Sequence, residues 1–278
     1  HCTLYVSLEP CSHYGKTPPC AELIIKKGIG RVVVGCLDPN PRVAGRGVKM
    51  LKDAGIEVVV GVLEEECKEL NKRFICLQEK KRPYVILKWA QTADGYIDCR
   101  LEVRGERLEV KGEGDGPLVI STPLMKQLVH QQRAENMAIM VGTRTVLQDN
   151  PKLLTTHWSG RNPIRITLDR HRILPADSKI FSDESETIVY RENTDWTFIL
   201  EDLAKRNIHS VLVEGGARLL NTIIESGVYD EVHVEVGDSL GLSVEGLEFR
   251  DLGVKAPEYT FRSKPKMIDG HCVYIEKH

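Results

Sequence analysis

The sequence contains no long apolar run, no marked excess of charge and no Gly-x-Gly-x-x-Gly motif. No stretch of the 278 residues is long and apolar enough to predict a membrane-spanning helix, and no secretory signal is visible. The formal net charge of −2 gives no electrostatic reason to expect nucleic acid or an anionic membrane as a partner. The Gly-x-Gly-x-x-Gly motif is typical of one common dinucleotide-binding turn, and its absence gives no support for that turn here. The composition is otherwise ordinary for a soluble globular protein.

The eight cysteines do not form a regular disulfide pattern. Seven of them fall within the first hundred residues, at irregular spacings. This distribution is more typical of reduced thiols with one metal-binding pair than of a secreted disulfide framework, so we expect a cytoplasmic protein. The sequence begins at His1 rather than at Met, so we expect a fragment or a processed product.

Short β-branched runs alternate with helical patterns along the first eighty residues, which predicts a parallel sheet covered on both faces. The charged segment Lys80–Pro83 should end this part, because the residue before a proline is disfavoured in a helix. We therefore predict one domain over residues 1–80 and a second over 83–278. In the first part we expect strands at Thr3–Leu8, Arg31–Gly35 and Glu57–Gly61, and helices at Cys20–Lys27, Val48–Ala54 and Glu64–Glu79.

The second part repeats the α/β alternation. The charged, glycine-containing stretch Asp98–Gly116 predicts an exposed hairpin or flap. The tail from Glu231 onward is richer in β pattern. We expect strands at Tyr84–Ala90, Met137–Gly142, Ile164–Asp169 and Ser210–Glu214, and helices at Thr122–Glu135 and Ala217–Ser226.

Two cysteines flank the loop of the first part that carries its chemistry, EPCSHYGKTPPC. Thiolates are good zinc ligands, but Cys11 and Cys20 alone cannot fill a tetrahedral site. Their spacing by itself favours a pair of inert buried cysteines. By themselves, His13 indicates a solvent-facing turn residue and Lys16 a surface charge.

Three segments carry the chemistry of the second part: LKWAQTADG, VHQQRAENMAIMVGTRTVLQDNPKLL and VLVEGGARLL. Arg133 could hold a phosphate bidentately or lie on the surface. Asp149 could orient a ligand or form a turn before Pro151. Gly215 and Gly216 open a helix, where backbone amides attract a phosphate, although a tight strand–helix turn needs the same residues.

Glu-Pro-Cys after a strand, then Thr-Pro-Pro-Cys opening a helix, resembles the second half of a cytidine-deaminase-type zinc signature. With the three later segments, in this order, the chain resembles the bifunctional deaminase/reductase family of riboflavin biosynthesis. The resemblance implies an α/β fold, with a partial cytidine-deaminase-like domain followed by a dihydrofolate-reductase-like domain over about residues 83–276. It also implies that Cys11 and Cys20 bind zinc, and that His13 and Lys16 face the substrate and its phosphate.

The same resemblance implies that the second domain reduces the ribosyl group of a pyrimidine ribose phosphate with NADPH, in a homodimer. By position it assigns catalysis to Lys88, Asp149 and Glu214, and substrate contacts to Arg133, Leu153 and Glu214. Cofactor contacts fall on Ala90, Thr145, Asp149, Gly215, Gly216, Ala217, Arg218, Leu219 and Leu220. Hydride transfer is the chemistry of such a cofactor, and the protein positions it.

The sequence departs from this family at several points. No His-x-Glu triplet precedes Cys11, so we expect a zinc site without its third ligand and no deaminase activity. An incomplete sheet would expose an edge, so we expect the first part to be mobile, aggregation-prone or covered by a partner. Val119 replaces a tryptophan, and Thr156 and His157 stand where relatives carry an arginine, for which Arg161 or Arg165 could substitute. A catalytically inactive nucleotide-binding or scaffold protein is the alternative.

Overall fold

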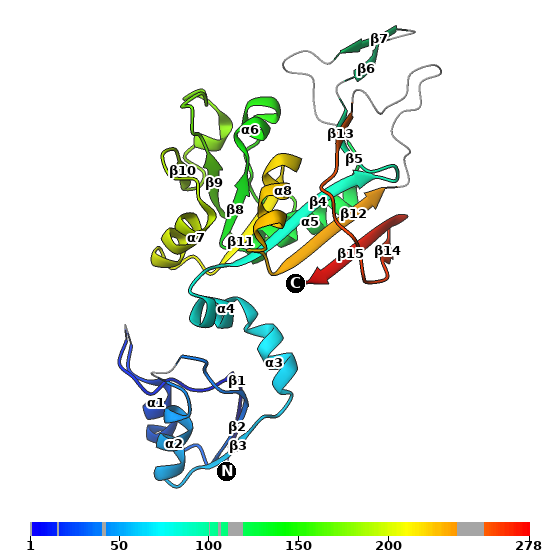
Figure 1. Cartoon of the computed structure of the whole chain (residues 1–278). Helices are drawn as coiled ribbons and strands as arrows, with labels where there is room; N and C mark the ends of the chain where they lie inside the picture. The colour runs from blue at the N-terminus through cyan, green and yellow to red at the C-terminus, as the bar shows by residue number, and fades with distance from the viewer. Residues whose placement is uncertain are drawn as a thin grey trace. The chain divides into compact units, whose positions relative to one another are not determined.

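The computed structural model describes the backbone of residues 2–15, 17–40, 43–99, 101–104, 107–110, 119–237 and 253–278, and their side chains except those of 99–104 and 107–110. The chain forms two compact units, His1–Pro83 and Tyr84–His278 (Figure 1). Each unit has its own sheet and its own apolar core. No helix within the described ranges is long and apolar enough to cross a membrane.

The first unit is a parallel three-stranded sheet in the order β1-β2-β3. The central strand is almost wholly buried, and Val32 and Val34 pack against Ala21 of α1 and Leu51 of α2. Because residues two apart share one face of a strand, α1 and α2 cover the same face. The elements are β1 (Thr3–Leu8), α1 (Cys20–Lys26), β2 (Arg31–Cys36), α2 (Arg46–Asp53) and β3 (Glu57–Val60).

The predicted helix Glu64–Glu79 is two helices, α3 (Glu64–Leu70) and α4 (Lys72–Lys80). The break falls at Asn71, whose side-chain amide donates to the Cys67 carbonyl at 2.8 Å. Asparagine side chains compete for backbone groups in this way and so interrupt helices. The α3 helix lies so close to the sheet that a Cβ on Gly35 would come within 2.2 Å of Cys67 Sγ. Only glycine fits at this point of β2.

The second unit is an eight-stranded sheet in the order β10-β9-β8-β11-β4-β12-β15-β14. The first six strands in this order are parallel, and β15 and β14 are antiparallel additions at one edge. The strands of this sheet are β4 (Tyr84–Thr92), β8 (Ala138–Val141), β9 (Ile164–Leu168), β10 (Thr187–Tyr190), β11 (Ser210–Gly215), β12 (Glu231–Gly237), β14 (Lys266–Ile268) and β15 (His271–Lys277).

Helices cover both faces of this sheet (Figure 1). On one face, Leu203 of α7 and Leu220 of α8 pack against Leu87, Val213 and Val232 of the strands. The other face carries α5, whose Arg133 bonds to Glu214 of β11. The helices are α5 (Pro123–Glu135), α6 (Thr143–Asp149), the 3₁₀ turn η1 (Lys179–Phe181), α7 (Trp196–Lys205) and α8 (Ala217–Ser226).

Thr122 and Pro123 start α5 as predicted, with the Thr122 hydroxyl accepting from the Met125 amide at 3.2 Å. No helix was expected at α6 or α7, and no strand was expected at β10. Within the predicted hairpin Asp98–Gly116, strands Leu101–Arg104 (β6) and Arg107–Val110 (β7) pair antiparallel, while 105–106 and 111–118 lie outside the described residues. A further pair joins β5 (Tyr96–Cys99) to β13 (Gly253–Lys255).

Arg165 is a fully buried cation in β9. Its guanidinium donates to the Ser182 hydroxyl at 3.0 Å and to the Ser182 and Ser185 carbonyls. It thereby fixes the loop between β9 and β10 from inside. This position leaves it unable to replace the absent arginine near a substrate phosphate.

We predict that Arg165→Met destabilises the second unit by about 3 kcal/mol, because it leaves several buried carbonyl oxygens without donors. The exposed Arg161→Met is the control and should change the free energy of unfolding by less than about 0.5 kcal/mol. Urea unfolding followed by tryptophan fluorescence measures this unit alone, since all three tryptophans lie in it. Equal stability of the two variants would show that Arg165 has no such role.

Candidate active site

The loops after β8 and β11 meet at the carboxyl ends of adjacent parallel strands. After β8 the chain continues to β9 and β10 at one edge of the sheet, whereas after β11 it continues to β12, toward the opposite edge. Adjacent strands whose connections run in opposite directions form a topological switch point, where α/β sheets bind ligands. The Gly142 amide donates to the Gly215 carbonyl at 2.9 Å. The peptide bond between Gly215 and Gly216 is cis. A Cβ on Gly216 would come within 3.4 Å of Thr145 Oγ1, so backbone and Thr145 line one close-packed cradle.

Some of the residues expected to contact the cofactor have accessible side chains, and others have buried ones. Ala217 and Thr145 are half-buried and Arg218 is exposed, at or beside this cradle. Asp149 is exposed one helical turn after Thr145, so both lie on one side of α6. The side chains of Leu219 and Leu220 are buried in the main core, which leaves their backbone to contact a ligand.

Arg133 and Glu214 form the central contact of the site. Arg133 Nε donates to Glu214 Oε1 at 2.8 Å and Nη2 donates to Oε2 at 2.5 Å, a bidentate pair between α5 and the end of β11. Nη1 donates to the Leu154 carbonyl at 3.1 Å. Both side chains are largely buried, with exposed fractions of 15% and 11%. The guanidinium is therefore already occupied by protein acceptors.

Charge interactions keep this pair ionised. Burial favours the neutral form of Glu214, but the neighbouring Arg133 and Lys88 outweigh burial and lower the pKa of Glu214. Burial opposes the charge of Arg133 in the same way, and Glu214 reverses this and raises the pKa of Arg133. The pair is thus a fixed dipole at the switch point.

Lys88 lies beside this pair on β4. Burial lowers the pKa of Lys88, the carboxylates of Glu214 and Glu235 raise it, and Arg133 lowers it further. Its Nζ lies 4.0 Å from Glu235 Oε2, which is beyond hydrogen-bond length. Ala90, two residues along β4, is half-buried on the same face of the strand.

The segment after Leu153 is fixed to α5 by a histidine. His130 Nδ1 accepts from the Thr156 amide at 3.0 Å. Its ring packs edge-on against the ring of His157, and the two ring centroids are 4.7 Å apart. Burial, followed by Arg133 and His157, lowers the pKa of His130 to about 4. Leu153 itself is buried against Ile139 and Val146 in a separate core cluster, so any ligand contact from it comes through its backbone.

The first unit brings its two expected zinc ligands together. The Cys20 amide donates to Cys11 Sγ at 3.3 Å, and a thiol–thiol hydrogen bond with Cys11 raises the pKa of Cys20. Within the described part of the chain, no third His, Cys, Asp or Glu joins a metal-binding cluster. His13 is exposed in the intervening loop, and Lys16 lies outside the described residues.

Sequence reasoning missed the carboxylate that organises this loop region. Glu9 is buried, and its Oε2 accepts from the amides of Asp38 and Gly45 at 3.2 and 2.9 Å, while Oε1 accepts from Val48 at 3.1 Å. The signal in the sequence that could have indicated Glu9 is its position directly before Pro10 and Cys11. Glu9 thus ties the cysteine loop to the start of α2.

A His-x-Glu triplet does occur in the chain, at His233–Glu235 on β12 of the second unit. His233 Nε2 contacts Glu231 at 2.8 Å and His271 Nδ1 contacts Glu235 at 2.7 Å. Both side chains are engaged by protein partners within the sheet. The triplet lies on a strand, whereas the matching deaminase triplet lies on a helix, so its side chains are placed differently. The triplet therefore does not supply the missing zinc ligand.

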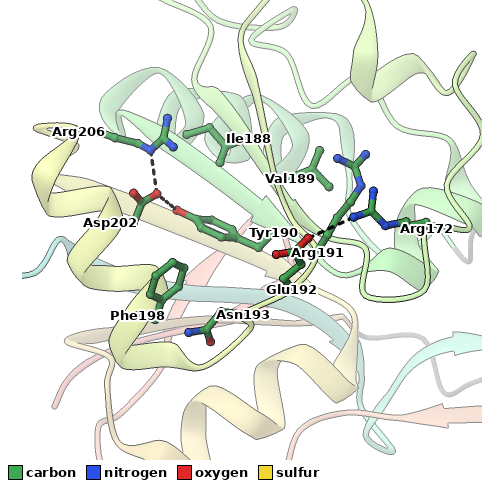
Figure 2. A pocket seen from close by; sticks show the side chains of 10 residues that line it. All are labelled: Arg172, Ile188, Val189, Tyr190, Arg191, Glu192, Asn193, Phe198, Asp202 and Arg206. Atoms are coloured by element: carbon green, nitrogen blue, oxygen red, sulfur yellow. Dashed lines mark hydrogen bonds and ion pairs between the residues drawn. The ribbon is translucent and has the colours of Figure 1, made fainter.

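A pocket of about 430 Å³ lies along the edge strand β10 and α7 (Figure 2). Its charged side chains already have protein partners. Asp202 accepts from Tyr190 at 2.6 Å and from Arg206 at 2.8 Å, and Arg172 lies 3.3 Å from Glu192. Arg191 lies 3.6 Å from Asp169, which is outside the lining. Two strands separate β10 from β11, which is roughly 14 Å at the usual strand spacing. This pocket is distinct from the Arg133–Glu214 site.

Comparisons with known proteins identify the second unit. The family model described as the RibD C-terminal domain matches residues 83–238. The riboflavin biosynthesis protein RibD of Aquifex aeolicus is 36% identical, over 96% of this chain and 77% of its own length. Its counterpart in Bacillus amyloliquefaciens is also 36% identical, over 98% of this chain and 81% of its own length.

The crystal structure of a diaminohydroxyphosphoribosylaminopyrimidine deaminase/5-amino-6-(5-phosphoribosylamino)uracil reductase from Thermotoga maritima is similar to the whole chain. It is 34% identical with a TM-score of 0.78, and the match covers 98% of this chain and 78% of that one. The predicted α/β fold class, with a dihydrofolate-reductase-like domain after an N-terminal parallel sheet, is confirmed. The chain belongs to the RibD family of bifunctional riboflavin-biosynthesis deaminase/reductases.

Proposed function

We propose that this chain reduces the ribosyl group of 5-amino-6-(5-phosphoribosylamino)uracil to a ribityl chain with NADPH. One observation carries the proposal: a buried, bidentate Arg133–Glu214 pair and the Lys88 ammonium lie at a switch point, next to a glycine cradle. Charged groups held in fixed positions in a dry site are suited to orient a polar substrate and stabilise developing charge.

The cradle has features that fit NADPH. No side chain of the described residues caps α8 at Gly216, and the first turn of a helix leaves backbone N–H groups free to meet a phosphate. Gly216, Ala217 and Arg218 would hold the pyrophosphate, with Thr145 and Asp149 on the α6 side. The bound cofactor supplies a hydride to the carbonyl or imine carbon of the opened ribose.

The protein's own residues do the positioning. Glu214 accepts hydrogen bonds from hydroxyl or amino groups of the substrate while Arg133 holds its carboxylate in place. The Lys88 ammonium donates an N–H toward the oxygen or nitrogen where charge develops. Because Arg133 is engaged by Glu214 and Leu154, the substrate phosphate needs another donor. The amides of Thr155 and Thr156 already donate to Asn162 and His130, so the exposed Arg161 is the candidate nearest in sequence.

We predict that Glu214→Gln lowers kcat/KM for this substrate by at least ~100-fold, since a displaced Arg133 misplaces the reacting groups. Loss of NADPH absorbance measures turnover, and tryptophan fluorescence confirms folding. Asp202→Asn, which also breaks a carboxylate–arginine pair but in the β10 pocket, is the matched control and should leave kcat unchanged. Folded wild-type protein that binds NADPH without turnover would instead support the inactive nucleotide-binding alternative.

We also propose that Cys11 and Cys20 are two ligands of a zinc site in the first unit. The hydrogen bond from the Cys20 amide to Cys11 Sγ supports this, because it brings the two cysteines together and orients the Cys11 sulfur. The 278 residues supply no His-x-Glu ahead of Cys11, so this polypeptide lacks the group that would move protons to and from a zinc-bound water.

The prediction for this polypeptide is weak zinc binding without deamination. Equilibrium dialysis should give one zinc per chain, lost in Cys11→Ser and retained in the buried control Cys76→Ser. Ammonia release from the diaminopyrimidine substrate should stay at the level of a protein-free blank with zinc present. Zinc-dependent ammonia release above that blank would contradict the proposal.

A further inference from the structure

A second buried carboxylate faces the proposed reductase site. Glu235 of β12 is only 2% exposed, and both of its oxygens are engaged. Ser121 Oγ donates to Oε2 at 2.6 Å, and Oε1 lies 2.7 Å from His271 Nδ1 on β15. His271 donates in this contact when Nδ1 carries a proton. Two residues from different elements therefore hold one carboxylate in one orientation.

Strand register places this carboxylate on the same face as Lys88. In the parallel pair of β4 and β12, Lys88 is opposite His233 and Ala90 is opposite Glu235. Side chains two residues apart share a face, so Lys88 and Glu235 lie diagonally on the face that α5 covers. The 4.0 Å from Lys88 Nζ to Glu235 Oε2 is close enough for strong attraction but too long for a hydrogen bond.

The charges around Lys88 do not cancel without Glu235. The charged groups that act on it are Arg133 from α5, Glu214 from β11 and Glu235 from β12. His233 is opposite it in the strand register, while His130 acts on Glu214 and His271 contacts Glu235. Glu214 is neutralised by its bidentate contact with Arg133. Glu235 is then the remaining negative charge near the ammonium, and among the described residues Lys88 donates no hydrogen bond to it.

We propose that Glu235 is a positioning residue for the reductase reaction: held by Ser121 and His271, it keeps Lys88 charged while leaving its N–H donors directed at the substrate. A direct hydrogen bond from Lys88 to Glu235 would consume a donor, whereas a carboxylate fixed 4.0 Å away stabilises the charge alone. This inference rests on the proposed function, because it assumes that Lys88 touches the reductase substrate.

The direct test is the pKa of Lys88, measured by NMR of the full chain labelled with ¹³C and ¹⁵N at lysine. Glu235→Gln removes the charge with little change of shape and should lower the pKa of Lys88 by about one unit or more. Glu276→Gln is the matched control. Glu276 is also a buried carboxylate, holding the Arg262 and Ser263 amides, but it pairs with Val232 and so lies on the opposite face. The control should leave Lys88 unchanged.

The activity test is the pH profile of kcat/KM. A charged Lys88 is present below its pKa and is lost as the pH rises through that value. In Glu235→Gln, the pH at which activity is lost on the alkaline side should therefore fall by the same amount as the Lys88 pKa measured by NMR. Glu235→Asp keeps the negative charge on a shorter side chain, so both values should lie between those of the wild type and of Glu235→Gln. The same variant provides the test if the glutamine variant fails to fold.

Each outcome decides a different claim. An unchanged Lys88 titration in a folded Glu235→Gln protein overturns the inference. A shifted titration with an unmoved activity profile overturns the role of Glu235 in the reaction. No turnover by the wild-type chain, together with a lowered Lys88 pKa in Glu235→Gln, refutes the proposed function while upholding the assignment of charge.

Discussion

The buried ion pair between Arg133 and Glu214 is the contact on which the second unit's site depends. It joins α5 to the end of β11, and a third donor of the same guanidinium holds the segment at Leu154. Removing one member of such a pair leaves an uncompensated buried charge, which is far more costly than the pair is favourable. Lys88 lies close enough to this pair for both of its members to shift the pKa of Lys88.

The two units contribute unequally to chemistry. The second unit brings Arg133, Glu214 and Lys88 together beside the Gly215–Gly216 turn at one switch point. The first unit brings Cys11 and Cys20 together, and Glu9 fixes the loops around them. Within the described part of the chain, no cluster of three or more metal-binding side chains forms around these two cysteines.

Local patterns predicted most of the parallel strands, because β-branched runs and alternation are short-range signals. The strand Thr3–Leu8 and the helix Ala217–Ser226 were predicted with their observed bounds. The break at Asn71 and the helix after Gly142 depend on side-chain hydrogen bonds and packing that periodicity does not encode. Glu235 was missed for the same reason, since its role arises from strands that meet only in the fold, although a carboxylate in an apolar strand is a visible signal.

The central claim is that Arg133 and Glu214 act as one unit in catalysis. A double-mutant cycle on kcat/KM, with Arg133→Met, Glu214→Gln and the combined variant, tests it most directly. The account predicts that the double variant is no slower than the slower single variant, because either change alone dismantles the pair. Losses that multiply in the double variant would show two independent roles and contradict the account.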